Sequence, residues 1–304
     1  MSVVGIGGCL ESKSQSNPTA IGVICGIVAS VFWATGFVGI RHGLNAGFSP
    51  AELTVHRYLW SGLVLLPVVI RLGIGDLIGV GWGRAILLTI LGGPVFAIIG
   101  YAGFLFVPLG QGGVIQPSCG ALGGVLLATL VLREKLITSR LLGALIITAG
   151  LIVIGGEGAA MLGKQSVAGD LLLVLAGFMS AYFSTLLRLW RIEPLPAAAA
   201  IGVLSLFGIP IYWITGDFAH MLSLGWRENL LQTILQGVLA GPAALYLFVK
   251  SIAVIGAGRA AIFFSLVPPF VLLIGWLALG EVPTVLQLIG LIIVLFGFQL
   301  TQKG

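Results

Sequence analysis

The sequence predicts an all-α integral membrane protein with ten transmembrane helices in two inverted five-helix repeats. Three observations lead to this prediction. Hydrophobic residues make up 58% of the 304 residues and charged residues only 8%, whereas a soluble domain carries about 25% charged residues. Apolar runs recur along the chain, and one glutamate–glycine pattern occurs twice. A chain of this composition cannot cover itself with polar surface, so lipid must be its solvent.

Ten apolar segments, most of about 18 to 24 residues, can each cross the ~30 Å hydrocarbon core as a helix. They are residues 20–40, 50–70, 85–107, 111–132, 140–156, 168–189, 196–215, 229–249, 257–279 and 283–301. Pro18 and Pro50 open the first two segments, where the missing N–H of proline costs nothing. The longest connection, residues 216–229, is expected to be an interfacial turn.

Lys and Arg residues predict how these segments are oriented. With the N-terminus inside, the inner loops hold eleven of them: Lys13, Arg71, Arg84, Arg133, Lys135, Arg140, Arg188, Arg191, Lys250, Arg259 and Lys303. The outer loops hold Arg41, Lys164 and Arg227. Because cytoplasmic loops carry the excess of Lys and Arg, both termini are expected to be cytoplasmic. Residues 1–19 are then a cytoplasmic tail, and the expected location is the inner (cell) membrane of a bacterium.

An internal repeat predicts how the helices are grouped. In each copy a glutamate is followed by glycines nine and sixteen positions later: Glu134, Gly143, Gly150 and Glu281, Gly290, Gly297. Upstream, "LGGP" at residues 91–94 matches "LAGP" at residues 239–242. Two five-helix repeats, residues 20–156 and 168–301, are predicted. An odd number of spans per repeat places the second copy upside down, and the basic residues around Glu134 are absent around Glu281, as inversion requires.

These features resemble those of the drug/metabolite transporter superfamily, EamA-like branch. The similar features are ten spans in two repeats, "FW" at residues 32–33, an arginine early in the second helix, and Pro268 followed by "LALGE" at residues 277–281 and Gly290. The first repeat departs from the motif, because Ala121 stands where Pro268 would align.

The resemblance implies a secondary transporter that works by alternating access. The substrates it implies are small metabolites such as amino acids or related compounds, moved by export. A nucleotide-sugar or other solute exchanger is the alternative within transport. An integral-membrane enzyme or a non-transporting membrane subunit is the alternative from another class.

No motif predicts a catalytic residue, a metal site or a cofactor. Residues 158–165, "GAAMLGKQ", are a near miss for a phosphate-binding loop, because Gln165 replaces the magnesium-binding Ser/Thr and no strand precedes it. The three histidines are far apart in sequence. The chain is therefore not expected to be an enzyme. The expected partners are a small-molecule substrate and the lipid bilayer, and no nucleic acid is expected. A homodimer is compatible with the sequence.

Several charged residues and prolines in or near the spans can have either a structural or a functional role. Glu134 and Glu281 at helix ends are expected to cap or anchor those ends, with ion coupling as the alternative. Glu52 and His56, at positions i and i+4, are the local candidates for a proton relay. Pro94 and Pro242 predict helices broken beside a central cavity, with simple kinks as the alternative.

The substrate site is predicted from polar side chains at a common depth. Arg57 lies ~10 Å below the outer end of its helix, with His56 beside it, and Tyr101 and Gln116 lie ~9 Å below theirs. Trp33 falls at a similar depth, so these residues are expected to line an outer vestibule. A charge at this depth needs water or a partner, which makes a carboxylate the expected guest of Arg57 unless its side chain snorkels to the interface. Lying nearer the inner side, Tyr182, Tyr246 and Ser265 are expected to serve the opposite gate.

Overall fold

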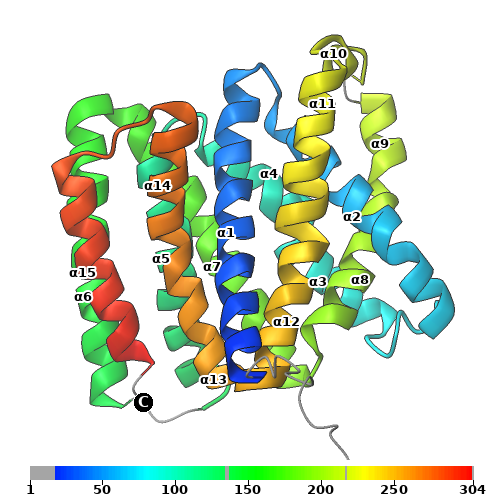
Figure 1. Cartoon of the computed structure of the whole chain (residues 1–304), viewed down its shortest axis with the longest axis horizontal. Helices are drawn as coiled ribbons and strands as arrows, with labels where there is room; N and C mark the ends of the chain where they lie inside the picture. Colours follow the sequence, from blue (N-terminus) through cyan, green and yellow to red (C-terminus); the bar gives the residue numbers. More distant parts are fainter. Residues whose placement is uncertain (1–17, 134–136, 216–217, 303–304) are drawn as a thin grey trace, which may run out of the picture.

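The computed structural model describes residues 18–133, 137–215 and 218–302, and these contain helices and no β-strand. Most of the predicted N-terminal tail, together with Glu134 and Lys135, lies outside the described residues. Figure 1 shows a bundle of upright helices with both ends of the described chain at the bottom. We call this the C-terminal side, and the opposite side, which holds the α1–α2 and α14–α15 connections, the Glu281 side.

The first half of the bundle contains α1 (Pro18–Asn45), α2 (Pro50–Leu72), α3 (Trp82–Gly92), α4 (Pro94–Gly103), α5 (Leu109–Leu130) and α6 (Thr138–Leu162). The second half begins with α7 (Lys164–Trp190), α8 (Pro194–Leu206), α9 (Gly208–Thr215), α10 (Phe218–Ser223) and α11 (Trp226–Gln232). It continues with the π-helix η1 (Thr233–Ala243), α12 (Ala244–Ile255), α13 (Ala257–Ala260), the 3₁₀-helix η2 (Ala261–Leu266), α14 (Val267–Leu279) and α15 (Val285–Thr301).

Eight helical segments within the described residues are long and apolar enough to cross a bilayer, so the chain is an integral membrane protein. They coincide with eight of the ten predicted spans. The segments Pro194–Pro210 and Val285–Thr301, on the seventh and tenth predicted spans, are apolar but shorter. The all-helical membrane class is confirmed, whereas the count of ten crossings stays a prediction.

Two of the spans break at the glycine–proline pairs of the repeat. Gly93 has φ −104° and ψ −147°, and Gly241 has φ −89° and ψ −112°, both outside the helical region. Proline disfavours helical geometry at the residue before it and lacks an N–H. The predicted span 85–107 is accordingly two helices, α3 and α4, and the span at 229–249 passes through η1. Both repeats therefore carry a break at the matching position.

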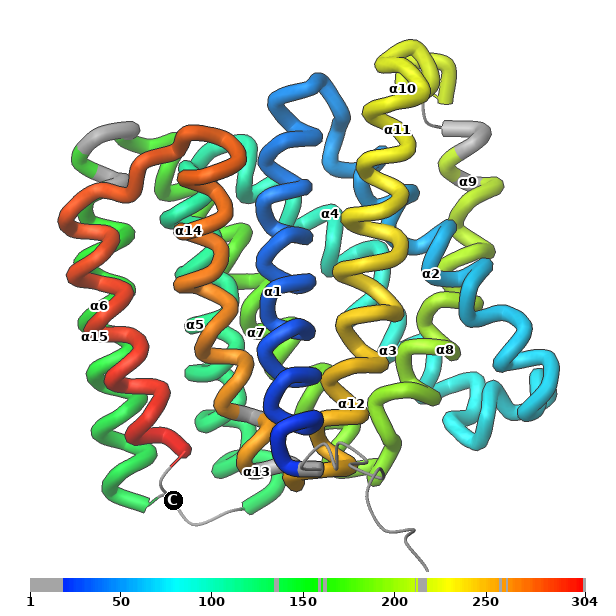
Figure 2. The backbone as a smooth tube through the Cα atoms, viewed as in Figure 1, coloured from blue at the N-terminus to red at the C-terminus, as the bar shows by residue number. Residues whose placement is uncertain are grey.

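The glycines that mark the repeat form the contact between α6 and α15, which lie side by side and run in opposite directions (Figure 2). A Cβ atom on Gly150 would lie 2.9 Å from the carbonyl oxygen of Gly290, and one on Gly143 would lie 2.7 Å from that of Gly297. In the repeat, Gly143 corresponds to Gly290 and Gly150 to Gly297. Each glycine thus contacts the counterpart of the other, which is the reciprocity that a two-fold axis between the halves produces.

Alanine at Gly150 is expected to lower the thermal stability of the purified protein in detergent. The added methyl would meet the backbone of Gly290 and the side chain of Val294, and overpacking of this kind costs about 1–3 kcal/mol. Gly156 on the same helix is the matched control, because its Cβ would meet nothing within 4 Å. Gly156→Ala should leave the midpoint unchanged or slightly raised, since alanine favours helix. Equal losses in both variants would contradict a close α6–α15 contact.

Single cysteines test the predicted inversion. In a variant without Cys9, Cys25 and Cys119, a cysteine at Ile137 is expected to react with a membrane-impermeant thiol reagent only from the cytoplasm. A cysteine at Val282, which is 71% exposed on the Glu281 side, is expected to react only from outside. Labelling of both positions from one side would end the inverted-repeat interpretation.

Candidate functional site

A cavity of about 500 Å³ lies between the two halves of the chain. Its lining comes from α1, α2, α4 and α5 of the first half and from α7, η1, η2, α14 and α15 of the second. Four of the residues selected from the sequence line it, each from a different helix: Trp33, Arg57, Tyr101 and Gln116. The bundle therefore brings a cation, a phenol, an amide and an indole to one space.

The direction in which this cavity opens differs from the expected outer vestibule. Its lining continues to Ser184, Arg188 and Gln302, which are exposed on the C-terminal side. The cavity therefore opens toward that side, and Arg57 lies near its far end. Counting residues along a helix gives the depth of a residue in the membrane, but it does not show to which side of the membrane a cavity at that depth opens. Contacts between helices decide that.

The guanidinium of Arg57 contacts only neutral groups among the described residues. It donates to the side-chain oxygen of Gln236 at 3.4 Å and to the carbonyl oxygen of Ala240 at 3.5 Å. The hydroxyls of Tyr58 and Tyr101 are its other hydrogen-bonding neighbours. Both measured distances exceed the 2.7–2.9 Å typical of charge-assisted hydrogen bonds. Instead of snorkelling to an interface, Arg57 holds a positive charge inside the bundle, next to neutral oxygens and to no carboxylate of the described residues.

Gln236 orients this part of the site, although sequence reasoning did not select it. Its side chain is fully buried, and its amide nitrogen donates to the carbonyl oxygen of Gly36 at 2.7 Å. The amide oxygen is thereby directed to Arg57 and to the Tyr101 hydroxyl, which donates to it at 3.3 Å. Only glycine at position 36 permits this approach, because a Cβ there would lie 2.6 Å from that of Ala240. The available signal was a glutamine inside an apolar run.

Helix α2 supplies donors to carbonyl groups near both breaks. The Tyr58 hydroxyl donates to the carbonyl oxygen of Gly92 at 2.8 Å, one residue before Gly93. The Ser61 hydroxyl donates to that of Gly237 at 3.1 Å, and Arg57 reaches the carbonyl oxygen of Ala240. Within lipid such carbonyls need partners from neighbouring helices. The breaks at Pro94 and Pro242 are thus held by α2 beside the cavity.

Aromatic side chains form an apolar wall of the cavity. Trp33 stacks on Phe264 with ring centroids 4.8 Å apart and an interplanar angle of 12°. Phe37 and Phe96 also line the space. Sequence reasoning identified Trp33 but not these phenylalanines, because phenylalanine in an apolar span gives no sign of facing a cavity.

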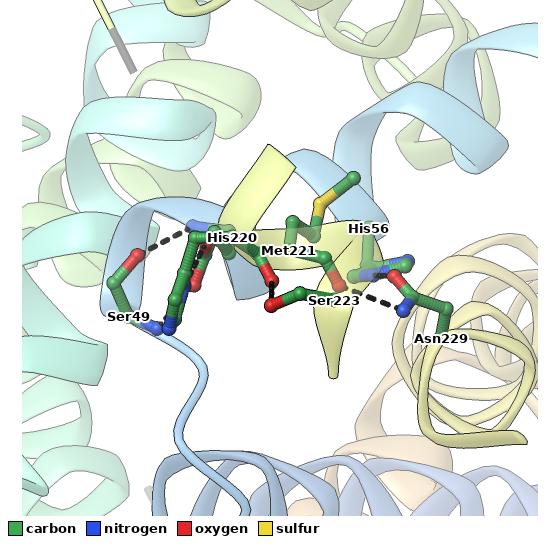
Figure 3. A network of polar contacts seen from close by, with 7 residues as sticks. Ser49, His56, His220, Met221, Ser223 and Asn229 are labelled. Atoms are coloured by element: carbon green, nitrogen blue, oxygen red, sulfur yellow. Dashed lines mark hydrogen bonds and ion pairs between the residues drawn. The ribbon is translucent and has the colours of Figure 1, made fainter. Parts of the chain in front are cut away.

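His56 lies outside this cavity, although it precedes Arg57 in the chain. One ring nitrogen is 3.1 Å from the side-chain oxygen of Asn229 and the other is 3.3 Å from the hydroxyl of Thr233. Glu52 forms a capping box with Ser49 and lies 2.8 Å from a ring nitrogen of His220. Figure 3 shows the contact between His56 and Asn229 and the contacts around Ser49 and His220. The two relay candidates are therefore held by different partners, and both attach α2 to the α10–α11 segment.

Tyr182, Tyr246 and Ser265 do not line the cavity either. Tyr182 is 38% and Tyr246 58% exposed on the bundle, and the Ser265 hydroxyl donates to the carbonyl oxygen of Ile262 at 2.6 Å. On α7 the cavity is instead lined by Ser180, Ser184 and Arg188. Their i, i+4, i+8 spacing places them on one helical face, and this polar stripe could have been found from the sequence.

The Glu281 side of the cavity is closed by contacts between the two halves. Arg41 at the end of α1 forms an ion pair with Glu281 at 2.6 Å and donates to the carbonyl oxygen of Phe104 at 3.2 Å. The other oxygen of Glu281 accepts the backbone N–H of Leu109, at the start of α5, at 3.0 Å. Glu281 thus caps a helix of the opposite repeat and pairs with a cation there. Its counterpart, Glu134, lies outside the described residues.

Comparisons with known proteins agree with this architecture. The model of the EamA-like transporter family matches residues 20–156 and 167–301. The uncharacterized transporter YdfC of Bacillus subtilis is 26% identical over 287 residues, covering 87% of this chain and 85% of that protein. An uncharacterized transporter of Archaeoglobus fulgidus is 24% identical over 278 residues, covering 89% and 93%.

A protein of known crystal structure matches this chain with a TM-score of 0.63 at 17% sequence identity, over 94% of this chain and 96% of that one. The two proteins therefore share a fold. The family model matches both halves and nearly the whole chain. The chain therefore belongs to the EamA-like transporter family, as the resemblance predicted.

Proposed function

We propose that this protein is a secondary transporter that exports small metabolites, such as amino acids or related compounds, by alternating access. The observation that carries the proposal is the cavity between the two repeats, closed at the Arg41–Glu281 pair and open at Arg188 and Gln302. We take the C-terminal side to face the cytoplasm and the membrane to be the cell membrane, because the loops expected on that side carry the excess of Lys and Arg. The open side is then the side from which an exporter takes its substrate.

Alternating access needs two states of similar free energy in which opposite sides are closed. The reciprocal contacts of Gly143 and Gly150 with Gly297 and Gly290 support it, because related halves can exchange conformations. The breaks at Gly93 and Gly241 support it as well, since a broken helix can bend where a continuous one resists. The ion pair between Arg41 and Glu281, which joins the halves on the Glu281 side, is partly exposed to solvent, so it can separate and form again.

The test is transport by the purified protein in proteoliposomes loaded with a panel of labelled metabolites, with and without a pH gradient. Export is expected to proceed without ATP, because the chain carries no phosphate-binding motif. Ala121→Trp is the blocked control, since Ala121 lines the cavity and the large ring would fill it while leaving the helices in place. A strict requirement for ATP hydrolysis, or equal export by Ala121→Trp, would contradict the proposal.

A further inference from the structure

The charges lining the cavity restrict the substrate beyond its size. We propose that the substrate is a net anion, with one acidic group on an apolar body and no ammonium group. This rests on the proposed function, because it concerns the same cavity. It departs from an ordinary amino acid, which would bring a positive charge into the space together with the negative one.

The first argument is the balance of charge. Among the described residues, the lining contains the guanidinium of Arg57 in its interior and no carboxylate. Arg188, at the exposed end of the lining, interacts with other groups of the chain and does not enter this balance. Three other carboxylates of the described residues are engaged elsewhere. Asp170 accepts the side-chain amide of Gln111 at 2.7 Å, and Glu157 accepts the hydroxyl of Thr284 at 2.7 Å, while Glu281 is paired with Arg41. An ammonium group near Arg57 would be repelled by the guanidinium and would meet no carboxylate of the described lining.

The second argument concerns the groups that surround Arg57. Arginine presents five N–H donors in a planar fork that matches a carboxylate with two parallel hydrogen bonds. Here it meets neutral oxygens only: those of Gln236 and Ala240 at 3.4 Å and 3.5 Å, and the hydroxyls of two tyrosines. A bound carboxylate would replace these long contacts with short charge-assisted ones. The buried Gln236 holds its oxygen beside the guanidinium, so a guest carboxylate would compete with neutral oxygens and with no other anion of the described residues.

The third argument concerns the walls. An ammonium without a carboxylate partner can bind the face of an aromatic ring, and Trp33 is the best such ring in the lining. One face of Trp33 is already covered by Phe264, and Phe248 lies against it at 5.3 Å. Together with Phe37 and Phe96, these rings offer the apolar body of a substrate a surface to pack against. Gln116 lines the same space, and its amide makes no hydrogen bond within the described residues.

The experiment compares ligands that share a skeleton and differ in charge. The probes are phenylalanine, 3-phenylpropanoate, 2-phenylethanesulfonate and phenethylamine, and their binding to the purified protein in detergent is measured by isothermal titration at neutral pH. A second series uses leucine and 4-methylpentanoate. Both phenyl anions are expected to bind about tenfold or more tightly than phenylalanine, because they gain the arginine contact without a repelled ammonium. Phenethylamine is expected to bind more weakly than either.

Two variants connect the preference to Arg57. Arg57→Lys keeps the positive charge, so it should still bind the anions more tightly than the zwitterionic amino acids, although both should bind more weakly than to the wild type. Arg57→Gln should bind the anions about tenfold or more weakly than the wild type and should no longer prefer them to the zwitterionic amino acids. Its unfolding temperature without ligand should stay near that of the wild type. The proposal is overturned if phenylalanine or leucine binds as tightly as the matching anion. It is also overturned if no anion of either series binds, or if Arg57→Gln keeps the order.

Transport separates failure of this inference from failure of the proposed function. The sulfonate remains ionised and does not leak through lipid as a neutral acid, so its export from loaded proteoliposomes reports on the protein alone. Export of phenylalanine without export of the sulfonate would overturn the anion inference and leave the transporter proposal standing. Binding of the sulfonate in detergent without export of either compound would overturn the transporter proposal and support the anion site.

Discussion

Replacing Arg41 with glutamine is expected to open the closed side of the cavity to the outside. The ion pair with Glu281 at 2.6 Å joins the two repeats there, and both side chains are about a quarter exposed, 24% and 27%. A partly exposed charge-assisted pair contributes about 1–2 kcal/mol. Its loss would shift the balance of inward-open and outward-open states by about tenfold.

The shift is measured with a cysteine at Ser180, in the lining, in a variant without the native cysteines. With Arg41 intact, an impermeant thiol reagent should reach this cysteine mainly from the C-terminal side. Arg41→Gln should make labelling from the opposite side about tenfold faster and should slow transport. Glu281→Gln should act at least as strongly, because Leu109 also loses its carboxylate acceptor.

Arg227 provides the matched control for this experiment. It is exposed on the Glu281 side and lies over the ring of Trp226, so Arg227→Gln removes a charge from the same side without touching the contact between the repeats. Its labelling rate should equal that of the parent protein. Unchanged labelling in Arg41→Gln and Glu281→Gln would show that the pair only anchors helix ends.

Arg57→Gln is expected to reduce kcat/KM for transport by about tenfold or more. Glutamine keeps the length and polarity of the side chain but removes the charge that the substrate meets, and a hydrogen bond to a charged group contributes about 1.5–3 kcal/mol. Folding should be little affected, because the contacts that Arg57 makes within the protein are long. The measurement is initial-rate transport in proteoliposomes, together with the thermal unfolding midpoint.

Arg71→Gln is the control for this variant, since Arg71 belongs to the last turn of the same helix and is exposed. It should transport like the wild type. If Arg57→Gln transports with wild-type kinetics, Arg57 does not bind the substrate, although it lines the cavity. A large loss of stability in Arg57→Gln would show that the guanidinium mainly holds the broken helix at Ala240.

Much of the fold could be predicted because its signals are local. Crossing a bilayer requires long apolar runs, so composition along the chain reveals the spans. Proline acts on its own neighbours, so the breaks at Gly93 and Gly241 could be placed from two matching tetrapeptides. The repeated glycines at Gly150 and Gly290 pointed to related halves, and they turned out to lie where the backbones of α6 and α15 pack closely together.

The site could be predicted only in part, because two of its determinants are not local. Counting residues from a helix end gives depth, and depth was enough to select Trp33 and Arg57 with their partners on α4 and α5. It says nothing of rotation about the helix axis, and Tyr182 and Tyr246 at suitable depths face away from the cavity. Gln236 was passed over because its importance comes from Gly36 on a distant segment.

By itself, the sequence determined that lipid surrounds this chain, where its apolar helices run, which positions break them and that its halves are related. These properties follow from hydrophobicity, backbone chemistry and spacing, which each segment carries alone. Only the tertiary structure decided which face of each helix meets the cavity, which side of it is closed, and that Arg57 has no described carboxylate beside it. Those depend on packing between segments more than a hundred residues apart, such as Arg41 with Glu281 and Arg57 with Gln236.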